Sequence, residues 1–293
     1  MLRSYRMRIL ITADLHYNNP RSRRLADELI DEMRSAPADV LLLIGDTAAS
    51  AGDDLERCLS RFEGFAGPKL FVAGNHELWT RGENSYRLWK EELPRRVKAL
   101  GWRWLEEEPF VAGGWGIVGS VGWYDYSFAY QSLGIPRRFY ERKISPGAAA
   151  VVGMADLVEG FDDVPEPMKQ VYARWNDGKF VKLGRSDEQF VVELEEKLER
   201  QLAGLKSVGS VLVAMHHLPF REMLPPPHTA QWDFVKAFLG AARLGETILK
   251  HENVKMVICG HTHLPMERQV GGVRAINIGS GYRVKRYRVI ELG

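Results

Sequence analysis

Five short apolar runs divide the chain, and a polar residue follows the end of each one. Runs of four to eight residues that are apolar throughout are typical of strands buried on both faces. Open α/β sheets bind their ligands beyond the carboxyl ends of such strands. The pattern therefore predicts five parallel strands that bring their ends to one place. The runs are RILITA (8–13), VLLLIG (40–45), KLFVAG (69–74), SVLVAM (210–215) and VKMVICG (254–260).

The stretches between these runs have the apolar spacing of amphipathic helices. Pro94 is expected to bend or end one of them. Residues 102–122 are predicted to form short strands, and 266–278 a hairpin with Gly271 and Gly272 at its turn. A last strand is expected at 287–292. The predicted helices are 22–35, 54–64, 83–99, 188–205 and 231–251.

The polar residues at the ends of the apolar runs are of the types that bind metals. Oxygen and imidazole ligands without cysteine suit Mn, Fe, Zn or Ni rather than a thiolate-based structural zinc site. Two pairs are spaced i and i+2, so that in extended chain each pair would point to one side and grip one ion. These pairs are Asp14 with His16 and His261 with His263. The other candidates are Asp46, Asn75, His76 and His216.

Glycine precedes three of these candidate residues. Gly45, Gly74 and Gly260 each stand at the end of a predicted strand. Glycine at such a position indicates a sharp turn and a close approach of the backbone to another group. Three repeats of this arrangement favour one site over scattered polar residues.

These motifs, taken in order, resemble the signature of the calcineurin-like metallophosphoesterases, and they cover nearly the whole chain. The resemblance implies an α/β fold, a four-layer αββα sandwich with mixed β-sheets. It also implies two divalent or mixed-valence metal ions (Mn, Fe or Zn) at the carboxyl ends of the strands. The matching segments are Asp14-Leu15-His16, Gly45-Asp46, Gly74-Asn75-His76-Glu77, His216 and Gly260-His261-Thr262-His263.

The resemblance also implies which residues hold which ion. Two divalent ions carry four positive charges and the two Asp carboxylates cancel two, so a positive surplus favours a phosphate ester. The hypothesis is hydrolysis of a small phosphomonoester or phosphodiester by a hydroxide that bridges the metals, with no covalent intermediate. One ion would be held by Asp14, His16, Asp46 and His263, and the other by Asp46, Asn75, His216 and His261.

His76 is the candidate catalytic residue. In the family, the histidine after the ligand asparagine faces the substrate and helps to protonate the leaving oxygen, a contribution of about 10²–10⁴-fold. The alternative is a histidine that only packs within its loop. Ser/Thr protein phosphatases carry an Asp three residues after the bridging Asp, which orients this histidine, whereas this chain has Ala49. The difference argues against a protein phosphatase, and either another group orients His76 or its role is weaker.

Two neighbours of the candidate ligands have more modest interpretations. His217 either faces the substrate or a ligand, or is a loop histidine bonded to a carbonyl, and the two alternatives carry equal weight. Glu77 is interpreted as a carboxylate at the start of a helix, where negative charge is favoured.

The segment at about 123–185 is not explained by these motifs. It is rich in aromatic residues and has a basic cluster formed by Arg137, Arg138, Arg142 and Lys143. It could form a cap over the metal site, with aromatics that stack on a base and an Arg that binds a second phosphate. For the aromatics the favoured alternative is a small core of their own. The chain is predicted to be one domain, 1–293, with this insertion or cap.

Composition is that of an ordinary enzyme, 45% hydrophobic and 27% charged over 293 residues. Lysine and arginine (40) exceed the acidic residues (38) by only two, so a nuclease with the same dinuclear chemistry is the less favoured alternative. A non-catalytic metal-binding scaffold is a further alternative, disfavoured because no candidate ligand is missing. Cys58 and Cys259 are expected to be reduced and buried. The opening MLRSYRMRIL has no apolar leader, so a cytoplasmic protein without a membrane partner is expected. Nothing in the sequence predicts an oligomeric state.

Overall fold

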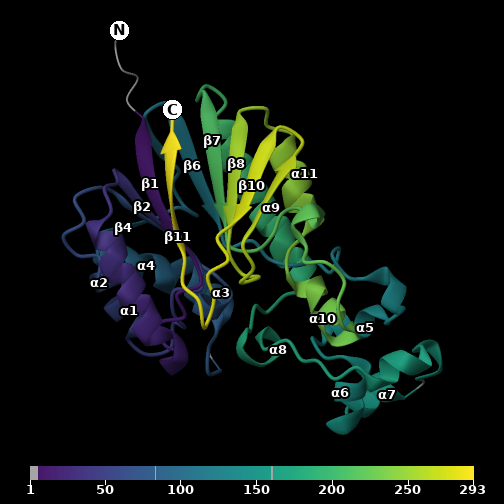
Figure 1. Cartoon of the computed structure of the whole chain (residues 1–293). Coiled ribbons are helices and arrows are strands. Elements are labelled where there is room, and N and C mark those ends of the chain that lie inside the picture. The colour runs from purple at the N-terminus through teal and green to yellow at the C-terminus, as the bar shows by residue number, and fades with distance from the viewer. Residues whose placement is uncertain (1–5, 83, 160) are drawn as a thin grey trace.

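The computed structural model describes residues 6–82, 84–159 and 161–293. Two β-sheets pack face to face and helices cover both outer faces, which confirms the predicted four-layer αββα sandwich (Figure 1). The expectation of no apolar leader falls partly on residues 1–5, and the predicted helix 83–99 begins at Glu83. These positions lie outside the described residues.

The first sheet contains the three predicted strands from the first third of the chain. Its strand order is β11-β1-β2-β3-β4, and only the pairing of β11 with β1 is antiparallel. The strands are β1 (Met7–Thr12), β2 (Val40–Ile44), β3 (Lys69–Val72), β4 (Trp102–Trp104) and β11 (Tyr287–Leu292).

The second sheet has the order β5-β6-β7-β8-β10-β9. Its four central strands are parallel and its two edge strands pair antiparallel, so both sheets are mixed as predicted. The predicted hairpin is formed by β9 and β10. The strands are β5 (Phe110–Ala112), β6 (Trp115–Ser120), β7 (Ser210–Met215), β8 (Val254–Cys259), β9 (Met266–Val270) and β10 (Val273–Asn277).

An apolar layer between the sheets holds them together. Successive side chains of a strand point to opposite faces, so a strand covered on both sides is apolar at every position. In β1, Ile9 and Ile11 face the other sheet, whereas Leu10 faces the helices. This is why the strands appear in the sequence as unbroken apolar runs. The layer between the sheets also includes Leu42, Ile44, Val72, Ile117, Leu212, Ala214, Ile258 and Ile276.

Helices cover the outer face of each sheet. Those beside the first sheet are α1 (Pro20–Ser35), α2 (Asp54–Ser60), α3 (Ser85–Arg87) and α4 (Leu93–Ala99) (Figure 1). The second sheet is covered by α9 (Asp187–Gly204) and α11 (Ala242–Leu249). No helix among the described residues is long and apolar enough to cross a membrane.

The predicted helix 231–251 is wrong as a single helix. The structure has α10 (Ala230–Val235), a 3₁₀ turn at Lys236–Phe238 and then α11. The break falls at Gly240, which forms a β-bridge with Leu218. A Cβ atom at Gly240 would lie 1.8 Å from the Leu218 carbonyl oxygen. Pairing with a distant segment therefore overrides the helical periodicity.

The predicted helix 83–99 is interrupted by a π-helical turn at Leu88–Glu92, between α3 and α4. Pro94 has no N–H and its ring would clash with the carbonyl four residues earlier. The N–H of Leu93 donates instead to Leu88, five residues back. The wider π-helical turn accommodates Pro94, and the chain remains helical on both sides of it.

The segment 123–185 connects β6 to α9 and lies beyond the carboxyl ends of the strands (Figure 1). Its buried aromatics, among them Trp123 and Phe139, belong to the same apolar cluster that packs against α9, rather than to a separate core. All four residues of the basic cluster have carboxylate partners. The segment contains α5 (Arg137–Glu141), α6 (Pro146–Val151), α7 (Ala155–Val158) and α8 (Asp177–Phe180).

Candidate metal centre and active site

The predicted site residues lie together at the carboxyl ends of β1, β2, β3, β7 and β8. They form groups whose candidate ligand atoms all lie within 4.8 Å of one another. One group is Asp14, His16 and His263, another is Asp46, His216 and His261, and a third is His16, Asp46 and His76. Asp46 therefore connects residues from both sheets.

Asp46 lies between the two main groups. Its Oδ1 is 3.3 Å from Nε2 of His216, and its Oδ2 is 3.9 Å from Nε2 of His16. Burial opposes ionisation of this carboxyl, but His216 and His76 hold its pKa well below the usual range. The arrangement gives one anionic group that faces both halves of the site.

The backbone at these residues is not extended as the i, i+2 pairs assumed. Asp14 and His16 still enter one group, so the correction concerns the pair His261 and His263. Five of the candidate ligands have φ between 44° and 72°, the left-handed region. Non-glycine residues occupy this region at a cost of about 1–3 kcal/mol each, and such residues cluster at functional sites. His261 and His263 consequently enter different groups instead of gripping one ion. The five residues are Asp14, His16, Asp46, His261 and His263.

The three predicted close approaches at glycines are confirmed. A Cβ atom at any of them would collide with a candidate ligand from another segment, so only glycine leaves room. The collisions would be Gly45 with His216 Nδ1 at 2.4 Å, Gly74 with Asp46 Oδ1 at 2.3 Å, and Gly260 with Asp14 Oδ2 at 2.5 Å.

His216 and His261 present nitrogen atoms to one another. Nδ1 of His216 lies 3.1 Å from the Ile44 carbonyl, and Nε2 of His261 lies 3.2 Å from the Phe238 carbonyl. If each of these nitrogens donates its proton, the remaining His216 Nε2 and His261 Nδ1 face one another as lone pairs at 3.2 Å. Burial disfavours the protonated form of His216, yet Asp46 raises its pKa to about 9. The site therefore favours a positive charge at this point, carried either by a proton on His216 Nε2 or by a metal ion.

Asn75 offers an unused oxygen to the same region. Its Nδ2 donates to Oδ1 of Asp177 at 2.9 Å, whereas its Oδ1 is buried without a hydrogen-bond partner. Buried polar atoms without partners are rare and costly. A free amide oxygen beside imidazole and carboxylate ligands fits a metal ion.

Asp177 comes from the segment 123–185, and no sequence motif pointed to it. It is 1% exposed and accepts four hydrogen bonds. Burial raises the pKa of this carboxyl, and hydrogen bonds from Asn75, Trp79 and Trp175 oppose the rise.

Glu77 has a larger role than the helix-start interpretation gave it. It does lie in a short 3₁₀ turn at His76–Leu78, but it is fully buried. Its carboxylate accepts the backbone N–H groups of Asp46 at 2.9 Å, Ala48 at 3.0 Å and Gly74 at 2.6 Å. Glu77 thus joins the loops after β2 and β3. Its place in the Asn75-His76-Glu77 motif was the signal.

His76 is oriented by packing on an aromatic ring. It stacks on Trp79 with ring centres 3.7 Å apart, and its backbone N–H donates to Asp46 Oδ1 at 2.9 Å. Burial lowers its pKa, although Asp46 and Asp177 oppose the change. With Ala49 in place of an acidic residue, the imidazole is held between the ring of Trp79, the ring of His16 and Oδ2 of Asp46, which is 3.6 Å from its Nε2.

A cavity of about 230 Å³ opens over these residues, and His76 lines it. Tyr282 stacks on His16 with ring centres 4.2 Å apart. Tyr282 follows β10, whose carboxyl end lies at the same edge of the sheet. Because the five other strand ends were already assigned to the site, the segment after β10 could have been predicted to belong to it as well. No motif predicted the other six residues that complete the walls, which are Trp79, Arg174, Trp175, Asn176, Trp232 and Leu239.

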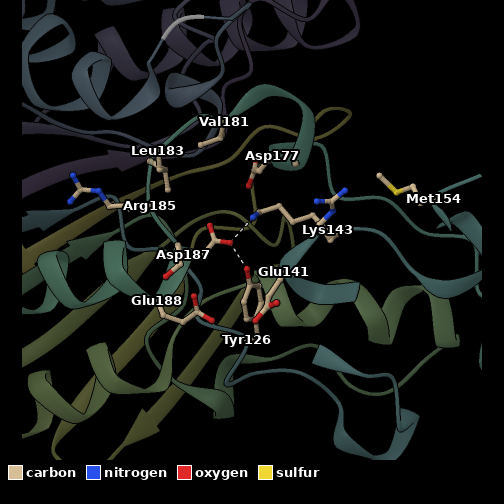
Figure 2. Close-up of a pocket in the computed structure, with 13 residues that line it drawn as sticks. Tyr126, Glu141, Lys143, Met154, Asp177, Val181, Leu183, Arg185, Asp187 and Glu188 are labelled. Carbon is tan, nitrogen blue, oxygen red and sulfur yellow. Dashed lines mark hydrogen bonds and ion pairs between the residues drawn. The ribbon is translucent and has the colours of Figure 1, made fainter. Parts of the chain in front are cut away.

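A larger pocket of about 630 Å³ is lined by Asp177 together with residues of the segment 123–185 and of α9 (Figure 2). Lys143 and Tyr126 both contact Asp187 there. It holds none of the candidate metal ligands and mixes acidic with basic side chains. The cavity over His76 is therefore the candidate active site.

His217 combines features of its two alternatives, since it contacts a backbone carbonyl and also packs on the candidate ligand His261. Its Nδ1 lies 3.0 Å from the Val121 carbonyl, and the residue is fully buried. Its ring lies 4.1 Å from that of His261, and burial lowers its pKa to about 3. It supports His261 without lining the cavity.

Comparison with known proteins gives a family and a fold. The model of the calcineurin-like phosphoesterases matches residues 7–265. The phosphopantetheinyl hydrolase PptH of Mycobacterium tuberculosis superposes with a TM-score of 0.70 at 19% identity, over 96% of this chain and 91% of that one. A dimetal phosphatase of Danio rerio gives 0.55 at 13% identity, over 98% and 92%. At these identities the likeness is one of fold. Among curated proteins, none matches significantly.

Proposed function

The chain belongs to the calcineurin-like phosphoesterase family, and from this premise we propose that it is a dinuclear metal-dependent hydrolase of a small phosphate ester. The observation that carries the proposal is the approach of His216 Nε2 and His261 Nδ1 to 3.2 Å beside Asp46. Two imidazole lone pairs and a carboxylate around one point are the donor set of a transition-metal ion.

The proposed ligands follow from the two groups. Asp14, His16 and His263 hold one ion, and His216, His261 and the free oxygen of Asn75 hold the other, with Asp46 shared. Mn, Fe and Zn all suit these donors. When bound, such ions supply Lewis-acid stabilisation of phosphoryl oxygens and lower the pKa of water.

His76 is the proposed general acid. It lines the cavity and is held against Trp79, so its imidazole has a fixed position beside the space for the leaving oxygen. Arg174 also lines the cavity, where its guanidinium suits an anionic group of the substrate. The indoles and Tyr282 limit the access of water around the ester.

We propose that the segment 123–185 acts as a cap within a single domain of 293 residues. It contributes Arg174 and Trp175 to the cavity wall and Asp177 to the hydrogen bonds behind it. The substrate would then be chosen by this segment, while the strand ends carry out the chemistry. The two buried, free cysteines agree with the proposed cytoplasmic location.

A small substrate is preferred to a nucleic acid. The basic cluster of the cap forms ion pairs with acidic side chains, so it offers no continuous basic track to the site. Of the residues that line the cavity, Arg174 is the one Lys or Arg.

The test is turnover of nitrophenyl phosphate and bis(nitrophenyl) phosphate by metal-stripped protein reloaded with Mn²⁺. The Asp46→Asn variant, purified in the same way, controls for contaminating phosphatases. We expect turnover by the wild type that is lost in the variant, and the preferred ester distinguishes a monoesterase from a diesterase. If two Mn²⁺ ions are bound and neither ester is cleaved, the scaffold alternative is favoured instead.

A further inference from the structure

Asp177 is a buried carboxylate that is satisfied by neutral donors alone. It accepts from Asn75 Nδ2 at 2.9 Å and Trp79 Nε1 at 2.6 Å through Oδ1. Through Oδ2 it accepts from Tyr124 OH at 3.1 Å and Trp175 Nε1 at 2.7 Å. No Lys or Arg forms an ion pair with it among the described residues. Buried anions normally have a cation as partner, because burying an unpaired charge is costly. A buried carboxylate without one is therefore a candidate for a specific role.

The contact with Asn75 has a direction that chemistry dictates. An ionised carboxylate only accepts hydrogen bonds, whereas an amide has a donor side and an acceptor side. If the amide of Asn75 were turned over, its oxygen would face the oxygen of Asp177. The carboxylate therefore holds the NH₂ of Asn75 toward itself and leaves Oδ1, which is buried without a hydrogen-bond partner, on the opposite side of the amide. Asn75 lines the same cavity as Asp46 and His261.

We propose that Asp177 is a positioning residue for the metal centre, which fixes the amide of Asn75 so that its oxygen is presented to the ion. This inference rests on the proposed function, because it needs an ion at that oxygen. The partners of metal ligands commonly contribute about 10–100-fold to metal affinity or activity.

The same carboxylate also holds parts of the cavity wall. Trp79 and Trp175 both line the cavity, and both direct their indole N–H to Asp177. His76 in turn stacks on Trp79. Asp177 thus contacts the candidate ligand Asn75, the ring that supports His76 and two residues of the cavity wall. The arrangement of the metal centre therefore depends on the position of the segment 123–185.

Asp187 provides a matched comparison. It is also buried, at 7% exposed, and it too accepts from an indole, Trp123 Nε1 at 2.7 Å, and from a tyrosine hydroxyl, Tyr126 OH. It differs in having a cation partner, Lys143, at 2.5 Å (Figure 2). No hydrogen bond connects it to a candidate ligand among the described residues. Replacing Asp187 therefore disturbs the cap without changing Asn75.

The experiment measures Mn²⁺ binding to metal-free protein by calorimetric titration for wild type, Asp177→Asn and Asp187→Asn. We expect two ions on the wild type, and a loss of about 10–100-fold in the affinity of one of them in Asp177→Asn. Asp187→Asn should bind both ions as the wild type does. Thermal unfolding of the metal-free proteins shows whether the two variants are folded.

Exchanging the two side chains distinguishes a positioning role from a purely structural one, because only a positioning role predicts a recovery of metal affinity. In Asn75→Asp/Asp177→Asn the hydrogen bond is reversed, and an oxygen again faces the ion. This double variant should bind the weakened ion more tightly than either single variant, as a double-mutant cycle measures.

The outcomes separate this inference from the proposed function. Unchanged binding in Asp177→Asn, equal losses in Asp187→Asn, or no recovery in the double variant would overturn the positioning role alone. A wild-type protein that binds no Mn²⁺ would overturn the proposed function, and this inference with it.

Discussion

The strand ends and the cap contribute to one site in different ways. The strand ends supply the candidate ligands, five of them on left-handed backbone, and Nε2 of His16 lies 3.0 Å from Nε2 of His263. The cap supplies an acceptor and indole rings that touch those groups from outside. The comparison teaches that the type of each ligand comes from short local motifs, whereas its orientation comes from a distant part of the chain.

One buried carboxylate from each region shows the same difference, Asp46 at the strand ends and Asp177 in the segment 123–185. Asp46 is surrounded by imidazoles, which hold its pKa low in spite of burial. Asp177 is surrounded by amide, indole and phenol donors, which leave it a fixed acceptor. The surroundings of Asp46 suit a cation. The surroundings of Asp177 suit a fixed hydrogen-bonded link between the candidate ligand Asn75 and the cap.

The largest effect is expected from Asp46→Asn at the strand ends. Both proposed ions lose their shared anionic ligand, so metal content should fall at both sites and turnover should drop by about 10³-fold or more. Elemental analysis of dialysed protein, with turnover on the preferred ester, measures this. Asp187→Asn, at the first residue of α9 where it contacts the cap, is the control and should keep both ions. An Asp46→Asn protein with full metal content would show that the two groups do not share this ligand.

His76→Ala tests whether a residue of the strand ends acts in catalysis without contributing to metal binding. Metal content should stay at the wild-type level, while kcat falls by about 10²–10³-fold on phenyl phosphate, whose leaving group needs a proton. The loss should be smaller on nitrophenyl phosphate. Equal losses on both substrates would remove the general-acid role and leave His76 as a packing residue.

Gly74→Ala tests the crowding at the strand ends. The new Cβ would lie 2.3 Å from Oδ1 and 2.5 Å from the backbone nitrogen of Asp46. We expect a loss of about 1–3 kcal/mol in the free energy of unfolding, measured by urea titration of metal-free protein. Gly204→Ala in α9, where a Cβ meets nothing within 4 Å, should instead stabilise by up to about 1 kcal/mol. A neutral Gly74→Ala would show that this loop can move aside.

Arg174→Ala should give the smallest change, because it acts on the substrate from the cap. We expect KM to rise about tenfold with kcat nearly unchanged, since the loss is one charged contact at an exposed wall. Arg138→Ala removes a half-buried cap arginine that is paired with Asp163 and does not line the cavity, and it should alter neither constant. A similar rise in KM for both variants would point to a general effect of cap charge.

The strands and the candidate ligands could be predicted because their signals are local. A strand covered on both faces is apolar throughout, and the residue after it is brought to the sheet edge by topology alone. The close approach at Gly74 was predictable for the same reason. The left-handed backbone at His261 and His263 was not, since the spacing alone suggested extended chain.

The contacts that depend on distant segments could not be read from the sequence. Asp177 is 102 positions from Asn75, and nothing near it in the sequence distinguishes it from the other acidic residues of the cap. The break at Gly240 depends on Leu218, and the role of Glu77 depends on the loop of Asp46. In each of these cases the partner comes from a separate element, and only the fold brings the two together.

The most direct test of the account is a stepwise titration of metal-free wild-type protein with Mn²⁺. Bound ions per chain and turnover of the preferred nitrophenyl ester are measured at each step. We predict that two ions bind per chain and that turnover appears with the second. Full turnover with one bound ion, or saturation at a single ion, would contradict the dinuclear centre.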